Sequence, residues 1–205
     1  MQRIVAFGMI WAMQRLILAS ASPQRKSLLE GLGLQCTVRP SNFDEESCDI
    51  RDPVERCRHL AAHKALAVHE KFPDSFVIGC DTLVVSANGT LLEKAPDAAS
   101  ARSMIGALSG TSCDVHSALS VVDPRGRHHE GISSSIVTFK KLTPQEVDWW
   151  ISTNLWRDRS GSFQIDGPGQ LLISRIEGDW TSVVGLPVYL LGELLRKAGY
   201  ELWNR

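Results

Sequence analysis

The sequence predicts an α/β protein in a single domain, with a mixed central sheet flanked by helices. Short apolar strand patterns alternate with helix patterns along the chain. One passage breaks the alternation, because strand patterns at 116–123 and 131–142 follow each other across a polar turn and predict a hairpin. With 205 residues, 43% of them hydrophobic, the chain is long enough to form a core without disulfides.

The first elements are a short strand, a capped helix and a second strand. Residues 16–18 are aliphatic, as in a buried strand. Ser22 suits the N-cap of a helix, Pro23 its first position and Gly33 its end. A further strand is expected at 35–39.

The rest of the chain shows the same signals. Asp52 and Pro53 open a long helix, and Thr143 opens another with a capping box to Glu146. The Asn-Gly pair at 88–89 predicts a tight turn into a second short strand. In order, the patterns predict a helix at 52–72, a strand at 75–86, a helix at 96–110, the two hairpin strands, a helix at 143–153, a strand at 171–176 and a helix at 186–199.

Charge and cysteine content exclude several classes of protein. The net charge of −1 leaves no broad positive surface for nucleic acid. Five scattered cysteines include no Cys-x-x-Cys pair, which argues against a disulfide framework or a zinc site and favours a reducing compartment. We therefore expect a cytoplasmic protein without a nucleic-acid partner.

The first residues carry an apolar run that is too short to span a membrane. The run VAFGMIWAM is well below the roughly 20 residues that a bilayer needs, and no convincing cleavage site follows it. The tripeptide Met-Gln-Arg occurs at 1–3 and again at 13–15, so Met13 is a candidate start. We expect residues 1–13 to be an extension or a mis-set start, followed by one domain at 14–205 with no membrane contact.

Two serines lie where the first strand meets the first helix. Ser20 and Ser22 stand beside the free backbone N–H groups of a helix start, and Arg25 and Lys26 add positive charge there. Such a junction can bind an anion. An ordinary capped helix with solvated basic residues fits the stretch equally well.

Two acidic positions are candidates for catalysis and metal binding. Asp81 interrupts the apolar strand at 75–86, where a buried carboxylate needs a metal, a base or a hydrogen-bond donor. A structural aspartate bonded to backbone amides or to an arginine is the alternative. Glu45 lies in an acidic cluster at 42–47, and with Asp81 it would suit Mg²⁺ or Mn²⁺. Taken alone, that cluster is typical of a solvated turn.

Three polar side chains of the long predicted helix are ambiguous by themselves. Lys64 lies among alanines, where it either reaches a partner or lies along the flank of the helix. His59 and His63 are four residues apart, but no general-base glutamate lies between them. A packed or surface pair is therefore favoured over a zinc site.

The loop at 159–169 is rich in glycine and carries two charged residues, Arg159 and Asp166. Glycines allow the backbone to approach a ligand closely, although an ordinary connecting loop fits equally well. Lys94, which follows the Asn-Gly turn, has no distinguishing feature by itself.

Taken in order, these segments resemble the Maf family of nucleoside triphosphate pyrophosphatases. The resemblance covers residues 15–200 and rests on the motifs LASASPQR, FDEES, AAHKA, GCDTLVV, LLEK, LSG, RSGSFQIDG and VVGLP. It implies a twisted mixed sheet flanked by helices, with a cleft between two lobes, as in the inosine-triphosphate pyrophosphatases. A homodimer is a further expectation from the resemblance.

The resemblance also implies a reaction. A nucleoside triphosphate would be hydrolysed to the monophosphate and pyrophosphate with a divalent cation, Mg²⁺, Mn²⁺ or Co²⁺. Asp81 is implied as the proton acceptor and, with Glu45, as a metal ligand. The residues implied to bind the triphosphate are Ser20, Ser22, Arg25, Lys64, Lys94 and Arg159. A nucleotide-binding regulator of cell division with little turnover is the alternative, although a carboxylate facing a polyanion favours the enzyme.

Three positions bear on substrate choice. Gln24 stands where the family has arginine, or tryptophan in its methyl-GTP branch, whereas Thr82 agrees with the dTTP/UTP branch. Asp166 replaces a glutamine of that branch. Because a carboxylate only accepts hydrogen bonds, Asp166 predicts a base that offers donors, such as guanine.

Overall fold

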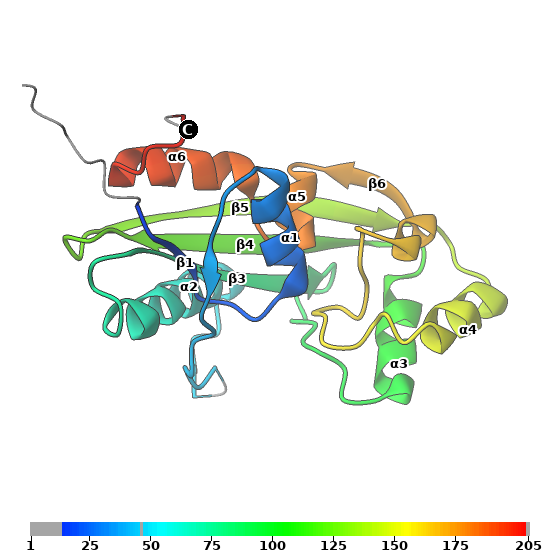
Figure 1. Ribbon diagram of the computed structural model, residues 1–205. Coiled ribbons are helices and arrows are strands. Elements are labelled where there is room, and N and C mark those ends of the chain that lie inside the picture. The colour runs from blue at the N-terminus through cyan, green and yellow to red at the C-terminus, as the bar shows by residue number, and fades with distance from the viewer. Residues whose placement is uncertain (1–13, 46, 204–205) are drawn as a thin grey trace, which may run out of the picture.

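The fold is built on one six-stranded, twisted sheet (Figure 1). The structure is a computed structural model that describes residues 14–45 and 47–203, so the expected extension at 1–13 lies outside it. The strands are β1 (Leu16–Leu18), β2 (Thr37–Val38), β3 (Phe76–Ser86), β4 (Ser112–Val122), β5 (His128–Phe139) and β6 (Ile173–Glu177), arranged in the order β2-β1-β3-β4-β5-β6. β1 pairs in parallel with β2 and β3, and the other pairs are antiparallel. The predicted mixed α/β sheet is confirmed.

The predicted helices are present within a few residues of their expected bounds. Ser22, Asp52 and Thr143 accept the capping hydrogen bonds that their positions predict. The helices are α1 (Pro23–Gly31), α2 (Pro53–His69), α3 (Ala98–Leu108), α4 (Pro144–Ser152), the 3-10 helix η1 (Pro168–Leu172), α5 (Trp180–Val184) and α6 (Val188–Ala198). Among the residues that the structure describes, no helix has both the length and the apolar character needed to cross a bilayer.

Two details differ from the predicted order. The second short strand expected after 88–89 is wrong, because that segment forms only a single bridge between Val85 and Leu91. The chain turns away after Leu92 donates to the Val84 carbonyl, and it then pairs with a distant loop instead. The sequence did not predict α5 or η1, since five residues are too few to show a helical period.

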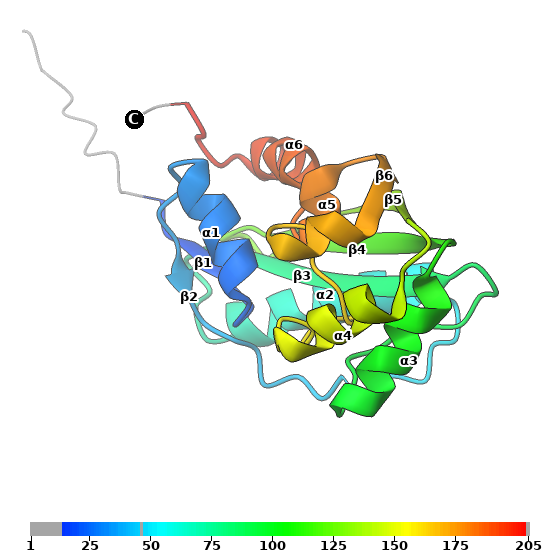
Figure 2. The same ribbon diagram turned by 90° about the vertical axis from the view of Figure 1, so that its right-hand side faces the viewer.

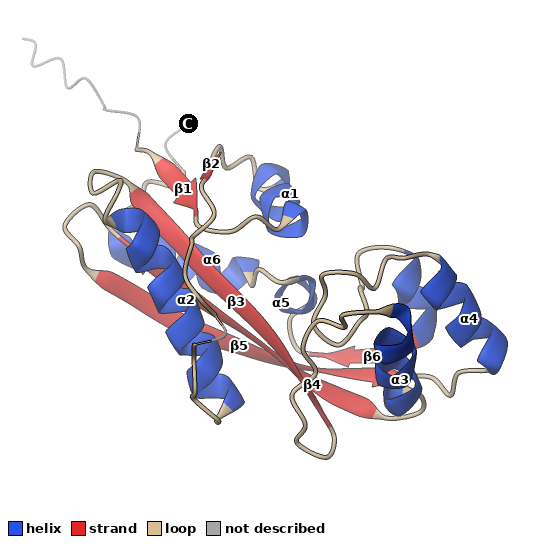
Figure 3. Cartoon of the chain, turned by 90° about the horizontal axis from the view of Figure 1, so that it is seen from below, coloured by secondary structure: helices blue, strands red, loops and turns tan. Residues whose placement is uncertain are grey.

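Helices cover both faces of the sheet. α2 lies against one face, with α5 and α6 on the other (Figures 1 and 3). Gly79 on β3 allows α2 to approach unusually closely, because a Cβ at that position would lie 2.1 Å from the Ala61 carbonyl oxygen. Side chains alternate along a strand, so Asp81 points to this same α2 face.

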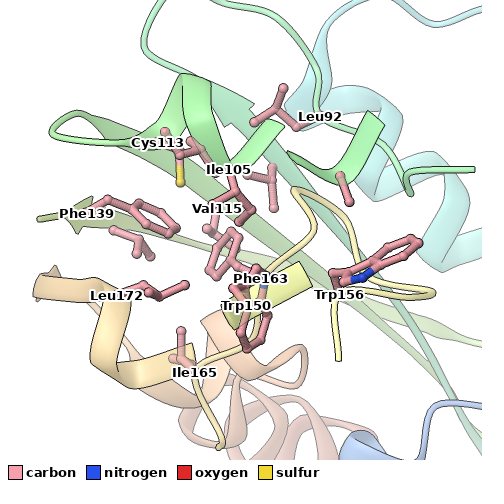
Figure 4. Packing of buried hydrophobic residues seen from close by; sticks show 14 of the residues in the cluster. Leu92, Ile105, Cys113, Val115, Phe139, Trp150, Trp156, Phe163, Ile165 and Leu172 are labelled. Atoms are coloured by element: carbon pink, nitrogen blue, oxygen red, sulfur yellow. The ribbon is translucent and has the colours of Figure 1, made fainter. Parts of the chain in front are cut away.

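Buried apolar side chains form two main clusters. One cluster joins β1 and β3 to α6, and it includes Leu18, Ile78 and Leu194. The other lies under α3 and α4, where Trp150 and Phe163 pack beside Val115 and Phe139 (Figure 4). Figure 2 shows the corresponding groups of elements, with β1, β2 and α1 on one side and α3 and α4 on the other. These groups agree with the expected two lobes, and the cleft between them stays a prediction.

One edge of β3 is only partly covered by its neighbour. β1 has three residues and β3 has eleven, so β1 ends opposite Ile78. Beyond that point, groups outside the sheet reach the β3 carbonyls. Arg25 donates to the carbonyl of Cys80, and Ser160 donates to that of Thr82. Segments from distant parts of the chain therefore converge at this edge.

Candidate active site

Asp81 is a buried acid on β3, just past the end of β1. The residue is 5% exposed, as its apolar surroundings in the sequence predict. Oδ1 accepts a hydrogen bond of 2.6 Å from Lys64 Nζ. Oδ2 is buried and has no partner among the described residues. Because an unpaired carboxylate oxygen is costly to bury, Oδ2 is suited to hold a water molecule or a cation.

Lys64 is the partner of this acid. It lies in the middle of α2 and is 7% exposed, so the alternative of a lysine lying along the helix flank is wrong. Its Nζ lies 2.6 Å from Asp81 Oδ1 and 3.0 Å from Glu45 Oε1. The close approach of α2 at Gly79 brings the ammonium group to β3. One buried cation therefore joins the strand carboxylate to the acidic loop.

An aromatic contact supports the loop that carries Glu45. Phe43 stacks on the His63 ring with centroids 5.0 Å apart, and His59 lies 4.1 Å from His63. The histidines are thus a packed pair, as expected. Burial and the neighbouring His59 lower the pKa of His63, which favours the neutral ring that stacks on Phe43. Glu45, two residues after Phe43 on the same loop, pairs with Lys64.

The serine turn is bonded within itself. Ser22 Oγ accepts the backbone N–H of Arg25 at 3.5 Å and donates to Gln24 Oε1 at 3.2 Å. Ser20 is 8% exposed, and its Oγ accepts from Ser22 N at 3.2 Å and from Arg25 Nη1 at 3.0 Å. These bonds fix the first turn of α1 beside β3, with Gln24 on the turn itself.

The Arg25 guanidinium is held by neutral oxygens. Nε donates to the Gly185 carbonyl at 2.9 Å, and Nη1 to that of Cys80 at 3.0 Å. Nη2 donates to Thr82 Oγ1 at 3.2 Å. Within the described part of the chain, Arg25 takes part in no ion pair. No acid of the described residues therefore pairs with its charge, and the predicted binding of an anion at this turn stays a prediction.

Lys94 lies on the segment that crosses the same edge of β3. Its backbone forms an isolated antiparallel bridge with Ser160. Ser160 Oγ donates in turn to the Thr82 carbonyl at 3.3 Å. Asp81 is the neighbour of Thr82 on β3. The exposed Lys94 side chain thus belongs to the same edge of the sheet as Asp81.

Arg159 and Asp166 lie on the neighbouring glycine-rich loop. Arg159 Nε donates to the Leu155 carbonyl at 2.8 Å. Burial lowers the pKa of Arg159, while the charges of Asp166 and Asp158 raise it. Asp166 itself is exposed. This loop therefore presents a cation with an acid in electrostatic reach of it.

Asp81 and Thr82 point to opposite faces of β3, because side chains alternate along a strand. The acid and its lysine lie on the α2 face, and the Arg25 guanidinium contacts the other face through Thr82. The two groups therefore lie on opposite faces of β3, just past the end of β1. Asp166 and the Lys94 side chain have no hydrogen bond to Asp81 among the described residues.

Three contributors were not predicted from the sequence. Gly79 sets the approach of α2, Gly185 supplies a carbonyl to Arg25, and Ser117 bonds to Thr82. Gly185 lies in the motif VVGLP, which contributed to the family resemblance but in which no residue was assigned a function. Ser117 gave none, since a serine within a strand has no distinguishing neighbour pattern.

The two carboxylates fit a hard divalent cation. Asp81 Oδ2 lacks a partner, and Glu45 is half-exposed beside the same lysine. Among the described residues, no group of three or more His, Cys, Asp or Glu side chains is placed to hold a metal ion. Such a pair suits Mg²⁺ or a similar ion that keeps several waters and takes further oxygens from a phosphate substrate.

The matches to known proteins extend over almost the whole chain. A family model described as Maf-like protein matches residues 15–198. The "dTTP/UTP pyrophosphatase" of Moorella thermoacetica is 41% identical over 94% of this chain and 100% of its own length. The protein of the same name from Pyrococcus furiosus is 36% identical over 93% of this chain and 98% of its own.

A solved structure of lower similarity was also found. It is the nucleoside-triphosphatase, or dITP/XTP pyrophosphatase, of Mycobacterium abscessus, with 14% sequence identity and a TM-score of 0.45. The match covers 62% of this chain and 74% of that one.

Proposed function

The chain belongs to the Maf-like protein family, and from this premise we propose that it hydrolyses nucleoside triphosphates to monophosphates and pyrophosphate. The observation that carries the proposal is the Asp81 carboxylate, with one oxygen bonded to Lys64 and the other buried without a partner. The names of the relatives support dTTP and UTP as substrates. The family resemblance, in which Thr82 agrees with the dTTP/UTP branch, supports the same substrates.

Binding of the triphosphate is the first task of the site. Arg25 forms an ion pair with no acid of the described residues, and the N-terminus of α1 adds the positive end of its helix dipole. Lys94 and Arg159 add two further cations at the edge of β3. We propose that these groups bind the phosphates together with Ser20 and Ser22.

Water activation is the second task. Asp81 Oδ2 accepts a hydrogen bond from the attacking water and takes its proton as the oxygen bonds to phosphorus. The bond between the α phosphorus and the oxygen that bridges it to the β phosphate breaks. Pyrophosphate leaves with the bridging oxygen and the electron pair of that bond. Lys64 keeps Asp81 oriented through Oδ1, so that only Oδ2 faces the reaction.

We propose that Asp81 and Glu45 hold a divalent cation, Mg²⁺, Mn²⁺ or Co²⁺, when substrate is bound. The cation would neutralise charge on the phosphate oxygens, as in other phosphoryl transfers. The pairing of hard carboxylate oxygens beside one lysine supports this proposal.

We also propose a cytoplasmic enzyme that forms a homodimer. All five cysteines are free thiols, and four of them are buried, which supports a reducing compartment. The homodimer rests on the family resemblance alone. Analytical ultracentrifugation of the full chain would measure it directly, and a monomer at micromolar concentration would contradict it.

Pyrophosphate release tests the function. The wild type is expected to release pyrophosphate from dTTP and UTP with Mg²⁺, Mn²⁺ or Co²⁺, and Asp81→Asn to reduce kcat by about 10²–10⁴-fold through loss of the base. An Asp81→Asn enzyme with wild-type turnover would remove Asp81 from its role. A wild type that binds triphosphates and releases no pyrophosphate would instead favour the regulator of cell division.

A further inference from the structure

We propose that Thr82 and Ser117 are positioning residues that fix the Arg25 guanidinium for the triphosphate. In this role Thr82 acts on phosphate binding through Arg25. The inference rests on the proposed function, because it assigns how one binding group of that site is held in place.

The contacts form one continuous chain across the sheet. Arg25 Nη2 lies 3.2 Å from Thr82 Oγ1, which lies 2.7 Å from Ser117 Oγ on β4. Ser117 Oγ lies 2.7 Å from the backbone carbonyl of Ser182 in α5. Ser117 and Ser182 are both 0% exposed, so water does not compete for these bonds.

The direction of every bond in the chain is determined. The Ser182 carbonyl can only accept, so the single hydroxyl proton of Ser117 is donated to it. Thr82 must therefore donate its own proton to Ser117 Oγ. The lone pairs of Thr82 Oγ1 are then free to accept from Arg25, whose guanidinium can only donate.

Gly185 completes the support from the end of α5. Its carbonyl accepts from Arg25 Nε at 2.9 Å and lies 3.4 Å from Thr82 Oγ1. Its φ of +123° is a conformation that side chains disfavour, and a Cβ there would lie 3.6 Å from Arg25 Nε. The end of α5 and the buried hydroxyls thus fix the guanidinium from two sides.

The bonds that Thr82 already makes limit what its hydroxyl can offer a base. Its only proton is used toward Ser117, and its oxygen already accepts from Arg25. An acceptor on a base would have to break the bond to Ser117 to gain that proton. Arg25, by contrast, has five N–H donors and four donor bonds within the protein, which leaves one for a phosphate oxygen.

The test is a substitution that removes the hydroxyl. Thr82→Val is expected to raise KM about tenfold for dTTP, UTP and GTP alike, since a hydrogen bond to a charged group is lost, with kcat within about twofold. Thr82→Ser keeps the hydroxyl and is expected to restore KM to within about twofold of wild type. Ser117→Ala is expected to raise KM in the same uniform way, by less.

A hydroxyl pair elsewhere in the sheet supplies the control. Ser112 Oγ and Thr138 Oγ1 lie 2.9 Å apart between β4 and β5, so Thr138→Val makes the same chemical change away from Arg25. It should leave KM unchanged. In an Arg25→Ala background, Thr82→Val should have no further effect on KM.

Two results would overturn the inference. One is a Thr82→Val enzyme with wild-type KM for all three substrates, and the other is a KM change confined to one base. Both require an active wild type, and a wild type that releases no pyrophosphate would instead refute the proposed function.

Discussion

The buried pair of Asp81 and Lys64 makes stability and activity depend on the same contact. Their side chains are 7% and 9% exposed, so each charge relies on the other more than on water. Removing one member of a buried pair costs more than the pair contributes, because an uncompensated charge is left behind. The two residues should therefore be strongly coupled.

Substitution of the lysine tests this coupling. Lys64→Met is expected to lower the free energy of unfolding by about 3 kcal/mol, because Asp81 is left buried without its partner. The double variant with Asp81→Asn removes both charges and should recover most of that loss. Urea unfolding of the two single variants and the double variant gives the coupling energy.

Lys140 provides the matched surface control. In its ion pair with Glu146 the two side chains are 41% and 32% exposed, so Lys140→Met should cost less than about 1 kcal/mol. Equal losses for the two lysine variants, or a double variant less stable than Lys64→Met, would contradict the coupling of Lys64 to Asp81.

The sequence supplied most of the residues proposed for the site, but not their contacts. Asp81 could be predicted because a lone acid in an apolar strand is conspicuous. Its bond to Lys64 could not, because it depends on how closely α2 packs against β3. Ser117 was missed because its importance comes only from Thr82 opposite it on the neighbouring strand.

The packing of α2 against β3 depends on a single glycine. At Gly79 the nearest atoms to an added Cβ are the Ala61 carbonyl oxygen at 2.1 Å and the Ala65 nitrogen at 2.7 Å. Both belong to the helix backbone, so the helix as a whole must move to relieve the clash. Lys64 lies on the same turn of α2 and would move with it.

Gly79→Ala is therefore expected to lower both stability and turnover. Overpacking of this kind costs about 1–3 kcal/mol. A shift of α2 also draws Lys64 away from Asp81, so kcat should fall about tenfold or more from misplacement of the base. Thermal unfolding and pyrophosphate release on the same preparation measure the two effects.

Gly106 in α3 is the control, because the same substitution there should raise stability instead of lowering it. No atom lies within 4 Å of a Cβ added there, and the residue is inside a helix. Gly106→Ala should raise stability by about 0.5–1 kcal/mol and leave kcat unchanged. A Gly79→Ala enzyme that behaves like Gly106→Ala would show that α2 does not depend on this contact.

Elements with strong local signals could be predicted, and those formed by tertiary contacts could not. α2 and α4 have a capping aspartate or threonine followed by proline, and both were found. α5 has five residues and a cap at Asp179, and it is held by bonds from Ser117 and Arg25. Such an element has its stabilising partners elsewhere in the chain.

The two groups of elements contribute different parts of the site. β1, α1 and α2 supply the phosphate turn and the lysine of the acid pair. The segment after β3 and the loop between α4 and η1 supply Lys94, Arg159 and Asp166. The residues proposed to bind phosphate thus come from both groups of elements, whereas Asp166, which is proposed to act on base choice, comes from the loop between α4 and η1.

Base choice should therefore depend on Asp166. A carboxylate can accept from both the N1–H and the amino group of guanine, whereas thymine and uracil offer it only one N–H beside two carbonyl oxygens. We expect the wild type to use guanine nucleotides better, relative to dTTP and UTP, than Asp166→Gln does. Values of kcat/KM for dTTP, UTP, CTP, GTP and 7-methyl-GTP measure the ranking.

A neighbouring acid separates base choice from a general charge effect. Both Asp166 and Asp158 act on the charge of Arg159, so replacement of either one leaves that cation less compensated. Asp158→Asn should change kcat/KM for all five substrates by a similar factor, because Arg159 is expected to bind phosphate. Asp166→Gln should in addition lower kcat/KM for GTP relative to kcat/KM for dTTP. The expected factor is about tenfold, because one hydrogen bond to a charged group is lost. If the two variants give the same ranking as the wild type, Asp166 does not contact the base.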